Sequence, residues 1–110
     1  MPDHLQIAVE EADPALVVKL RGDLDLGSCD ALRARLAGAE LDGKPAIVVD
    51  LRDLAFLDSS GLRAHIVASR SAASNARGFA LIAGRDEIQR AFTISRTADR
   101  FEWIDPQNLD

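Results

Sequence analysis

The chain has 110 residues, of which 47% are hydrophobic and 28% are charged. This length fits one domain with one ordinary core, and the composition differs from that of a disordered chain or a membrane protein. The formal net charge of −5 disfavours direct binding to nucleic acid, which requires clustered Lys and Arg residues. We therefore expect one globular domain over residues 1–110 that does not bind nucleic acid directly.

The sequence also indicates where the protein works. The first four residues, Met1-Pro2-Asp3-His4, lack the basic and apolar regions of a secretory signal. No apolar run approaches the ~20 residues that a membrane-spanning helix requires. Because Cys29 is the only cysteine, no internal disulfide can form, which suits a reducing compartment. These features predict a cytoplasmic protein with no membrane partner.

Two strands are expected to open the chain. Apolar residues alternate with polar or small ones over 5–9 and again over 16–20. The turn signal Asp13-Pro14 lies between them, and Gly22 breaks the second run. An opening hairpin is therefore predicted.

A helix is expected next, with Ser28 as its cap and Asp30 in its first turn. Either Gly38 or Gly43 can end it. Its buried face is expected to comprise Cys29, Leu32 and Leu36.

The middle of the chain has the pattern of a strand, a loop, a helix and a second strand. Residues 46–51 form a nearly unbroken apolar run that is rich in β-branched residues, which is typical of a central strand covered on both faces. A short stretch, 53–57, leads to a loop at 58–61, after which helical spacing continues to about Gly78. Residues 79–83 read as another strand.

The last elements complete an α/β pattern. A helix is expected with Asp86 and Glu87 in its first turn, and 101–104 has the composition of an edge strand. The buried side of this helix is expected to comprise Ile88, Ala91 and Phe92. Strands that alternate with helices after a hairpin predict a mostly parallel sheet with an antiparallel edge and helices packed on it.

The loop Asp58-Ser59-Ser60-Gly61 is the most informative part of the sequence. It is expected at the carboxyl end of the central strand, where partners and ligands of such sheets usually bind. Its two hydroxyl groups stand where a helix begins, next to backbone N–H groups that have no partner within the helix. A phosphate placed there could accept hydrogen bonds from those N–H groups.

Two blocks of sequence resemble the STAS domain, and specifically the bacterial anti-sigma-factor antagonists. The first block is 54–62 (LAFLDSSGL), which follows the apolar strand 47–51 (IVVDL). The second is 22–25 (GDLD), followed by a helix that contains Leu32. The blocks occur in the order that the family has, and the resemblance covers nearly the whole chain. It implies a STAS-like fold.

The resemblance further implies partner switching in transcription regulation and stress responses. The unmodified antagonist binds an anti-sigma factor that is also a Ser kinase, and a sigma factor is thereby released. The kinase phosphorylates the first serine of the motif, here Ser59, which turns binding off, and a Ser phosphatase reverses this. The residues implied for partner binding are Asp23, Asp25, Asp58, Ser59, Ser60, Gly61 and Leu62.

Several of these residues also suit purely structural roles. Asp and Ser are common helix caps, so residues 58–60 could serve only to start a helix. Asp23 and Asp25 would equally suit a polar turn after a strand. For Asp50, at the end of the buried run, we favour a hydrogen-bonded structural role.

Other classes of function agree less well with the residues. A serine hydrolase needs a His base beside its nucleophile, and His65 lies too far along the expected helix to reach Ser59. One Cys and scattered His residues give no zinc pattern, and no cofactor is indicated. A receiver-like phosphorylated Asp50 would need a late-strand Lys where this chain has Ala83-Gly84-Arg85. We expect a binding module rather than an enzyme; the alternative is a STAS adaptor subunit of a transport or stress-signalling assembly.

Overall fold

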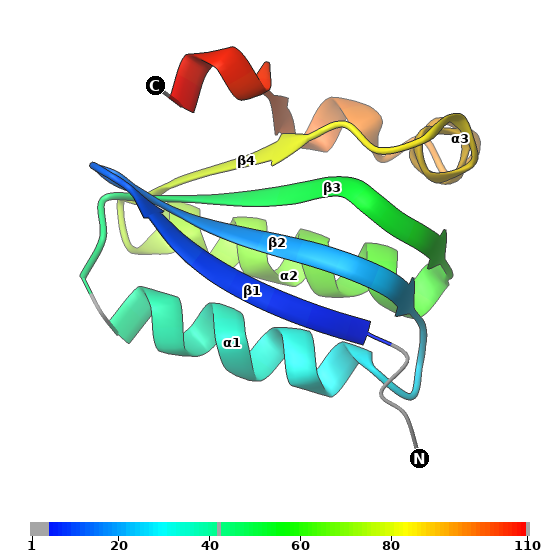
Figure 1. Ribbon diagram of the computed structural model, residues 1–110, viewed down its shortest axis with the longest axis horizontal. Helices are drawn as coiled ribbons and strands as arrows, with labels where there is room; N and C mark the ends of the chain where they lie inside the picture. The colour runs from blue at the N-terminus through cyan, green and yellow to red at the C-terminus, as the bar shows by residue number, and fades with distance from the viewer. Residues whose placement is uncertain (1–4, 42, 110) are drawn as a thin grey trace.

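A computed structural model describes residues 5–41 and 43–109 (Figure 1). Five strands form one sheet in the order β1-β2-β3-β4-β5. Strands β1 and β2 pair antiparallel, and the pairs β2–β3, β3–β4 and β4–β5 are parallel. The expected α/β fold, with a mostly parallel sheet and an antiparallel edge, is confirmed. The strands are β1 Leu5–Ala12, β2 Ala15–Leu24, β3 Ala46–Leu57, β4 Gly78–Ile82 and β5 Glu102–Trp103.

Two long helices cover one face of the sheet. Figure 1 shows α1 (Cys29–Leu41) and α2 (Ser59–Ser74) side by side beneath the strands. The third helix, α3 (Asp86–Ile94), follows β4 and buries Ile88 and Phe92. Two short 3-10 helices complete the described chain, η1 (Ala98–Arg100) and η2 (Pro106–Leu109).

Strand β3 contributes to two apolar clusters on opposite faces of the sheet. Its residues Ile47 and Val49 belong to the main core, which includes residues of α1 and α2. Val48, between them, belongs to a smaller cluster against which Leu109 of η2 packs. Because successive side chains of a strand point to opposite faces, a strand covered on both faces needs an unbroken apolar run. The predicted central strand is confirmed.

Strand β3 is longer than expected and continues to Leu57. Arg52 and Asp53 interrupt the apolar run, which is why the sequence pattern suggested an end near residue 51. Their side chains are exposed, and the backbone pairing with β2 continues as far as Leu24 and Leu57 across two register shifts. This extension brings the end of β3 beside the end of β2.

The start of α1 differs from the expectation in part. The Ser28 hydroxyl donates to the carbonyl of Asp23 at 2.8 Å and accepts from the N–H of Asp25 at 3.0 Å. Ser28 stands at the cap position directly before α1, as expected, and its carbonyl accepts from the N–H of Leu32 at 3.4 Å. Its hydroxyl, however, holds the preceding loop together and does not bond to the first turn of the helix. The helix passes through Gly38, and Gly43, with a φ of 75°, lies in the turn beyond its end.

The turn after α3 contains no glycine, yet it takes the conformation that glycine usually supplies. Arg96 has a φ of 60°, in the left-handed region. Its N–H donates to the carbonyl of Thr93, and the N–H of Thr97 donates to the carbonyl of Phe92 at 3.0 Å. These bonds satisfy the last carbonyl groups of the helix, as in a glycine-ended helix.

Candidate functional site

The site lies where the loop after β2 meets the turn between β3 and α2. The N–H of Asp58 donates to the carbonyl of Leu24 at 3.2 Å. The Oδ2 atom of Asp58 accepts a hydrogen bond from the N–H of Leu26, also at 3.2 Å. The two sequence blocks that carry the resemblance are therefore joined directly.

Asp58 is the N-cap of α2. Its backbone is extended, and its Oδ1 atom accepts from the N–H of Gly61 at 3.1 Å. Because Asp58 caps the helix, neither serine that follows needs to. Ser59 is exposed and Ser60 is half-buried, and within residues 5–41 and 43–109 neither hydroxyl group forms a hydrogen bond.

The two acidic residues of the loop after β2 differ in their contacts. The Oδ1 atom of Asp25 accepts from the N–H of Ser28 at 3.1 Å and from its hydroxyl at 3.2 Å. The carboxylate of Asp23 has no hydrogen bond or ion pair with any described residue. Both side chains are half-buried. The carboxylate of Asp25 thus shapes the loop, whereas that of Asp23 is available to a partner.

Gly61 and Leu62 lie beneath this surface and are buried. A Cβ atom at Gly61 would lie 2.5 Å from Leu57 Cδ1 and 2.9 Å from Leu24 Cγ. A side chain at this position would therefore force Leu57 and Leu24 to shift, whereas glycine lets the first turn of α2 approach the ends of β2 and β3 closely. Both buried residues set the position of the exposed ones.

Sequence reasoning did not single out two exposed apolar side chains at this end of the sheet. Leu26 is 75% exposed, and its N–H binds Asp58. Phe56 is 50% exposed, and it pairs with Asp23 in the parallel register of β2 and β3. The signal for Leu26 was its place between Asp25 and Gly27, because a large apolar residue in a polar loop is unusual. Single exposed apolar side chains are common on protein surfaces, so it is the position of these two beside the Asp58 turn that makes them candidates for partner contact.

His65 is fully buried on α2. Its Nδ1 atom lies 2.8 Å from the carbonyl oxygen of Gly61. Its ring forms T-shaped contacts with Phe92 and Phe101, at centroid distances of 6.2 and 6.5 Å. A carbonyl can only accept, so Nδ1 carries the proton, and Nε2 has no partner. Burial lowers the pKa of His65 to about 4, although the bond to Gly61 opposes this. His65 is thus a neutral core residue whose ring is bonded away from Ser59.

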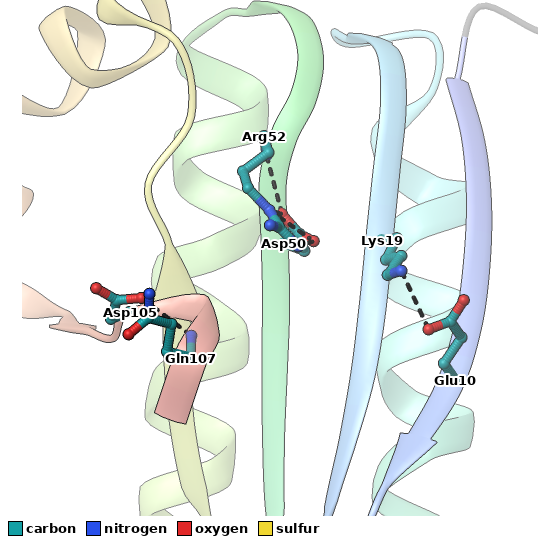
Figure 2. Close-up of polar contacts among 6 residues, drawn as sticks. All are labelled: Glu10, Lys19, Asp50, Arg52, Asp105 and Gln107. Carbon is teal, nitrogen blue, oxygen red and sulfur yellow. Dashed lines mark hydrogen bonds and ion pairs between the residues drawn. The ribbon is translucent and has the colours of Figure 1, made fainter. Parts of the chain in front are cut away.

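Asp50 has the structural role that the sequence suggested. Figure 2 shows its carboxylate beside the guanidinium group of Arg52. Arg52 donates through Nη2 at 2.7 Å, through Nε at 3.0 Å and through its backbone N–H at 3.0 Å. Burial acts to raise the pKa of Asp50, but these hydrogen bonds and the charge of Arg52 hold it below its usual value. Asp50 lies in the middle of β3, which disfavours the receiver-like alternative.

The same view shows Lys19 paired with Glu10, at 3.1 Å, and Gln107 beside Asp105 (Figure 2). Among the described residues, no three His, Cys, Asp or Glu side chains group closely enough to hold a metal ion. Over 5–41 and 43–109, every helix is too short or too polar to cross a membrane.

Comparisons with known proteins agree with this geometry. The family model for the STAS domain matches residues 6–107. The structure superimposes on an anti-sigma factor antagonist from Mycobacterium paratuberculosis with a TM-score of 0.84 and 25% identity, over 99% of this chain and 93% of that one.

Two structures of SpoIIAA show the same fold at 21% identity. The unphosphorylated form of this anti-sigma factor antagonist has a TM-score of 0.79, over 94% of this chain and 91% of that one. The phosphorylated form, from Bacillus, has a TM-score of 0.71, over 94% of this chain and 95% of that one. The family-model match covers both strand ends and the α2 motif, and the chain therefore belongs to the STAS domain family.

Proposed function

We propose that this protein is an anti-sigma-factor antagonist controlled by phosphorylation of Ser59. Its unphosphorylated form binds an anti-sigma factor that has Ser-kinase activity and so releases a sigma factor. The kinase transfers the γ-phosphoryl group of ATP to Ser59 Oγ, leaving ADP, and binding is lost. A Ser phosphatase restores the active form. The similarity to an antagonist over nearly the whole of both chains supports this role.

The observation that carries the proposal is that Asp58 caps α2 while the side chain of Ser59 forms no hydrogen bond with a described residue. Serine is a common N-cap residue, but here the cap is Asp58, whose carboxylate binds the N–H of Gly61. The Ser59 side chain is left exposed and without a hydrogen bond in the described chain. A kinase can therefore reach Ser59 Oγ without breaking a contact of the fold. Ser60 is half-buried, which favours Ser59 as the modified residue.

The surroundings of Ser59 explain why phosphate would prevent binding. Leu26 and Phe56 offer apolar surface, and Asp23 and Asp58 place negative charge beside it. A phosphoserine adds about −1.5 to −2 charge at neutral pH. A partner that accepts these carboxylates would have to desolvate that further charge at the interface. Unfavourable charge contacts of this kind cost several kcal/mol, and each ~1.4 kcal/mol is tenfold in affinity.

We propose further that the protein acts by binding and not by catalysis. Ser59 would need an adjacent base to serve as a nucleophile, whereas the ring of His65 is buried and bonded to Gly61. The proposed partners place the protein in the cytoplasm.

Titration calorimetry of the reconstituted complex tests the proposal. The partner is identified by affinity capture from the host and titrated, with ADP, against the wild type, Ser59→Ala, Ser60→Ala and the phosphorylated protein. We expect both alanine variants to bind, and phosphorylation to weaken binding by about 100-fold. Undiminished affinity of the phosphorylated protein would contradict the switch. Capture of a transport or stress-signalling assembly without a Ser kinase would favour the adaptor role.

A further inference from the structure

Arg63 lies one helical turn beyond Ser59 on the exposed side of α2. Residues four apart in a helix are neighbours on its surface, with Cβ atoms about 5–6 Å apart. Both side chains are exposed. Long side chains in a helix favour rotamers that lean toward its amino end, which favours a position of the Arg63 side chain over the turn that holds Ser59.

The guanidinium group of Arg63 has no partner among the described residues. It forms no hydrogen bond or ion pair with a residue of the described ranges 5–41 and 43–109. The nearest carboxylate in sequence, that of Asp58, is occupied, because its two oxygens accept the N–H groups of Gly61 and Leu26. Arg63 is thus free to take a new anionic partner.

We propose that Arg63 forms an ion pair with the phosphoryl group of phosphorylated Ser59. This inference rests on the proposed function, because it assumes that Ser59 is the modified residue. An anion that precedes a cation by four residues is the favourable orientation on a helix. Guanidinium groups bind phosphate through two parallel N–H donors, which makes this pair stronger than a Lys pair.

The pair has two consequences for the switch. Arg63 draws the phosphate along the exposed side of α2, away from the carboxylate of Asp58, so the fold tolerates the modification. It also favours the dianionic phosphate over the monoanion, so the full negative charge is present at neutral pH. The carboxylates on the two joined loops at this end of the sheet oppose this effect, because their negative charge favours the monoanion. These are the carboxylates of Asp58, Asp23 and Asp25.

The test uses the full chain with phosphoserine incorporated genetically at position 59, so that it does not depend on the kinase. The second phosphate pKa is measured by ³¹P NMR titration in the wild-type background and in Arg63→Gln, Arg63→Lys and Arg70→Gln. Arg70 is a matched control, since it is exposed on the same helix and lies roughly 16 Å along the axis from Ser59. We expect Arg63→Gln to raise this pKa by about 0.5, Arg63→Lys to raise it less, and Arg70→Gln to leave it unchanged.

An unchanged pKa in Arg63→Gln would overturn the inference, as would equal changes in Arg63→Gln and Arg70→Gln, which would indicate only the general field of the protein. The same samples separate this inference from the proposed function. If the phosphorylated protein bound the anti-sigma factor as tightly as the unmodified one, the switch would fail. The Arg63 pair would still stand if its predicted pKa differences were observed.

Discussion

The carboxylate of Asp58 accepts a hydrogen bond from the backbone N–H of Leu26, 32 residues earlier in the chain. Its other oxygen caps α2 through the N–H of Gly61. One side chain therefore fixes both the start of the helix that carries Ser59 and the loop that presents Leu26. The geometry of the proposed binding surface depends on this residue.

Replacing Asp58 tests this dual role. Loss of an N-cap typically costs ~1 kcal/mol, and here the N–H of Leu26 also loses its partner. We expect Asp58→Ala to lower the free energy of unfolding by about 1–2 kcal/mol, and Asp58→Asn, which keeps one acceptor oxygen, to lower it less. Urea unfolding measures both, with Asp99→Ala as a control at an exposed acidic residue. Equal stability of Asp58→Ala and Asp99→Ala would contradict the capping role.

Burial of His65 makes stability depend on pH. Its folded-state pKa of about 4 lies below the ordinary value of 6.5, so between these values the unfolded chain binds a proton that the native protein does not. The resulting loss in the free energy of unfolding is absent above pH 6.5 and grows as the pH falls towards 4. Since one pKa unit corresponds to about 1.4 kcal/mol, we expect a loss of about 3 kcal/mol over this range.

The His65 effect is isolated with a variant that cannot titrate. Carboxylates also begin to protonate near pH 4, so urea midpoints are compared for the wild type and His65→Leu between pH 7 and pH 4.5. The wild type should lose more stability than His65→Leu as the pH falls. Parallel curves would show that His65 remains accessible to protons in the native state.

An Ala→Gly change is expected to stabilise the protein at Ala76 but to destabilise it at Ala73. The φ of Ala76 is 57°, and it lies in the turn after α2, where its N–H donates to the carbonyl of Ala73. Glycine takes this left-handed conformation without the steric cost of a Cβ atom. We expect Ala76→Gly to stabilise the protein by about 0.5–1 kcal/mol and Ala73→Gly, within exposed helix, to destabilise it by about 1 kcal/mol. Thermal unfolding distinguishes the signs, and destabilisation by both changes would contradict this account.

Local patterns predicted the elements of the fold and their order, because apolar alternation and unbroken apolar runs report directly on burial. They misplaced the end of β3, since Arg52 and Asp53 sit on a paired but exposed stretch that no single-strand pattern reveals. They placed Ser28 correctly before α1 but could not show that its hydroxyl is bonded back to the loop and not to the first turn of the helix. The end of β3 depends on pairing with β2, which is distant in sequence, and the bonding of the Ser28 hydroxyl depends on the irregular loop before α1.

The candidate site shows the same division. The family resemblance located 58–62 and 22–25, but one-dimensional spacing could not show that Asp58 caps α2 while Ser59 stays free. Nor could it show that Gly61 and Leu62 are buried while Leu26 is exposed. Burial is a property of the assembled strand ends, and it separates the residues that can touch a partner from those that support them.

The exposed apolar residues give the sharpest test of where the partner binds. Leu26 adjoins the Asp58 carboxylate and is 75% exposed, so a partner that covers it would remove apolar surface from water. Val67, on α2, is also exposed at 50%, but it lies roughly 12 Å along the helix from Ser59. If the anti-sigma factor binds over the joined loops, Leu26→Ala should weaken the complex by about 1–2 kcal/mol, or roughly 5–30-fold, and Val67→Ala should not. Because both side chains are exposed, neither change should alter the thermal midpoint, so calorimetric titration reads the interface alone. Weaker binding by Val67→Ala with unchanged binding by Leu26→Ala would place the partner on the outer face of the helices and would remove the reason for Ser59 to control it.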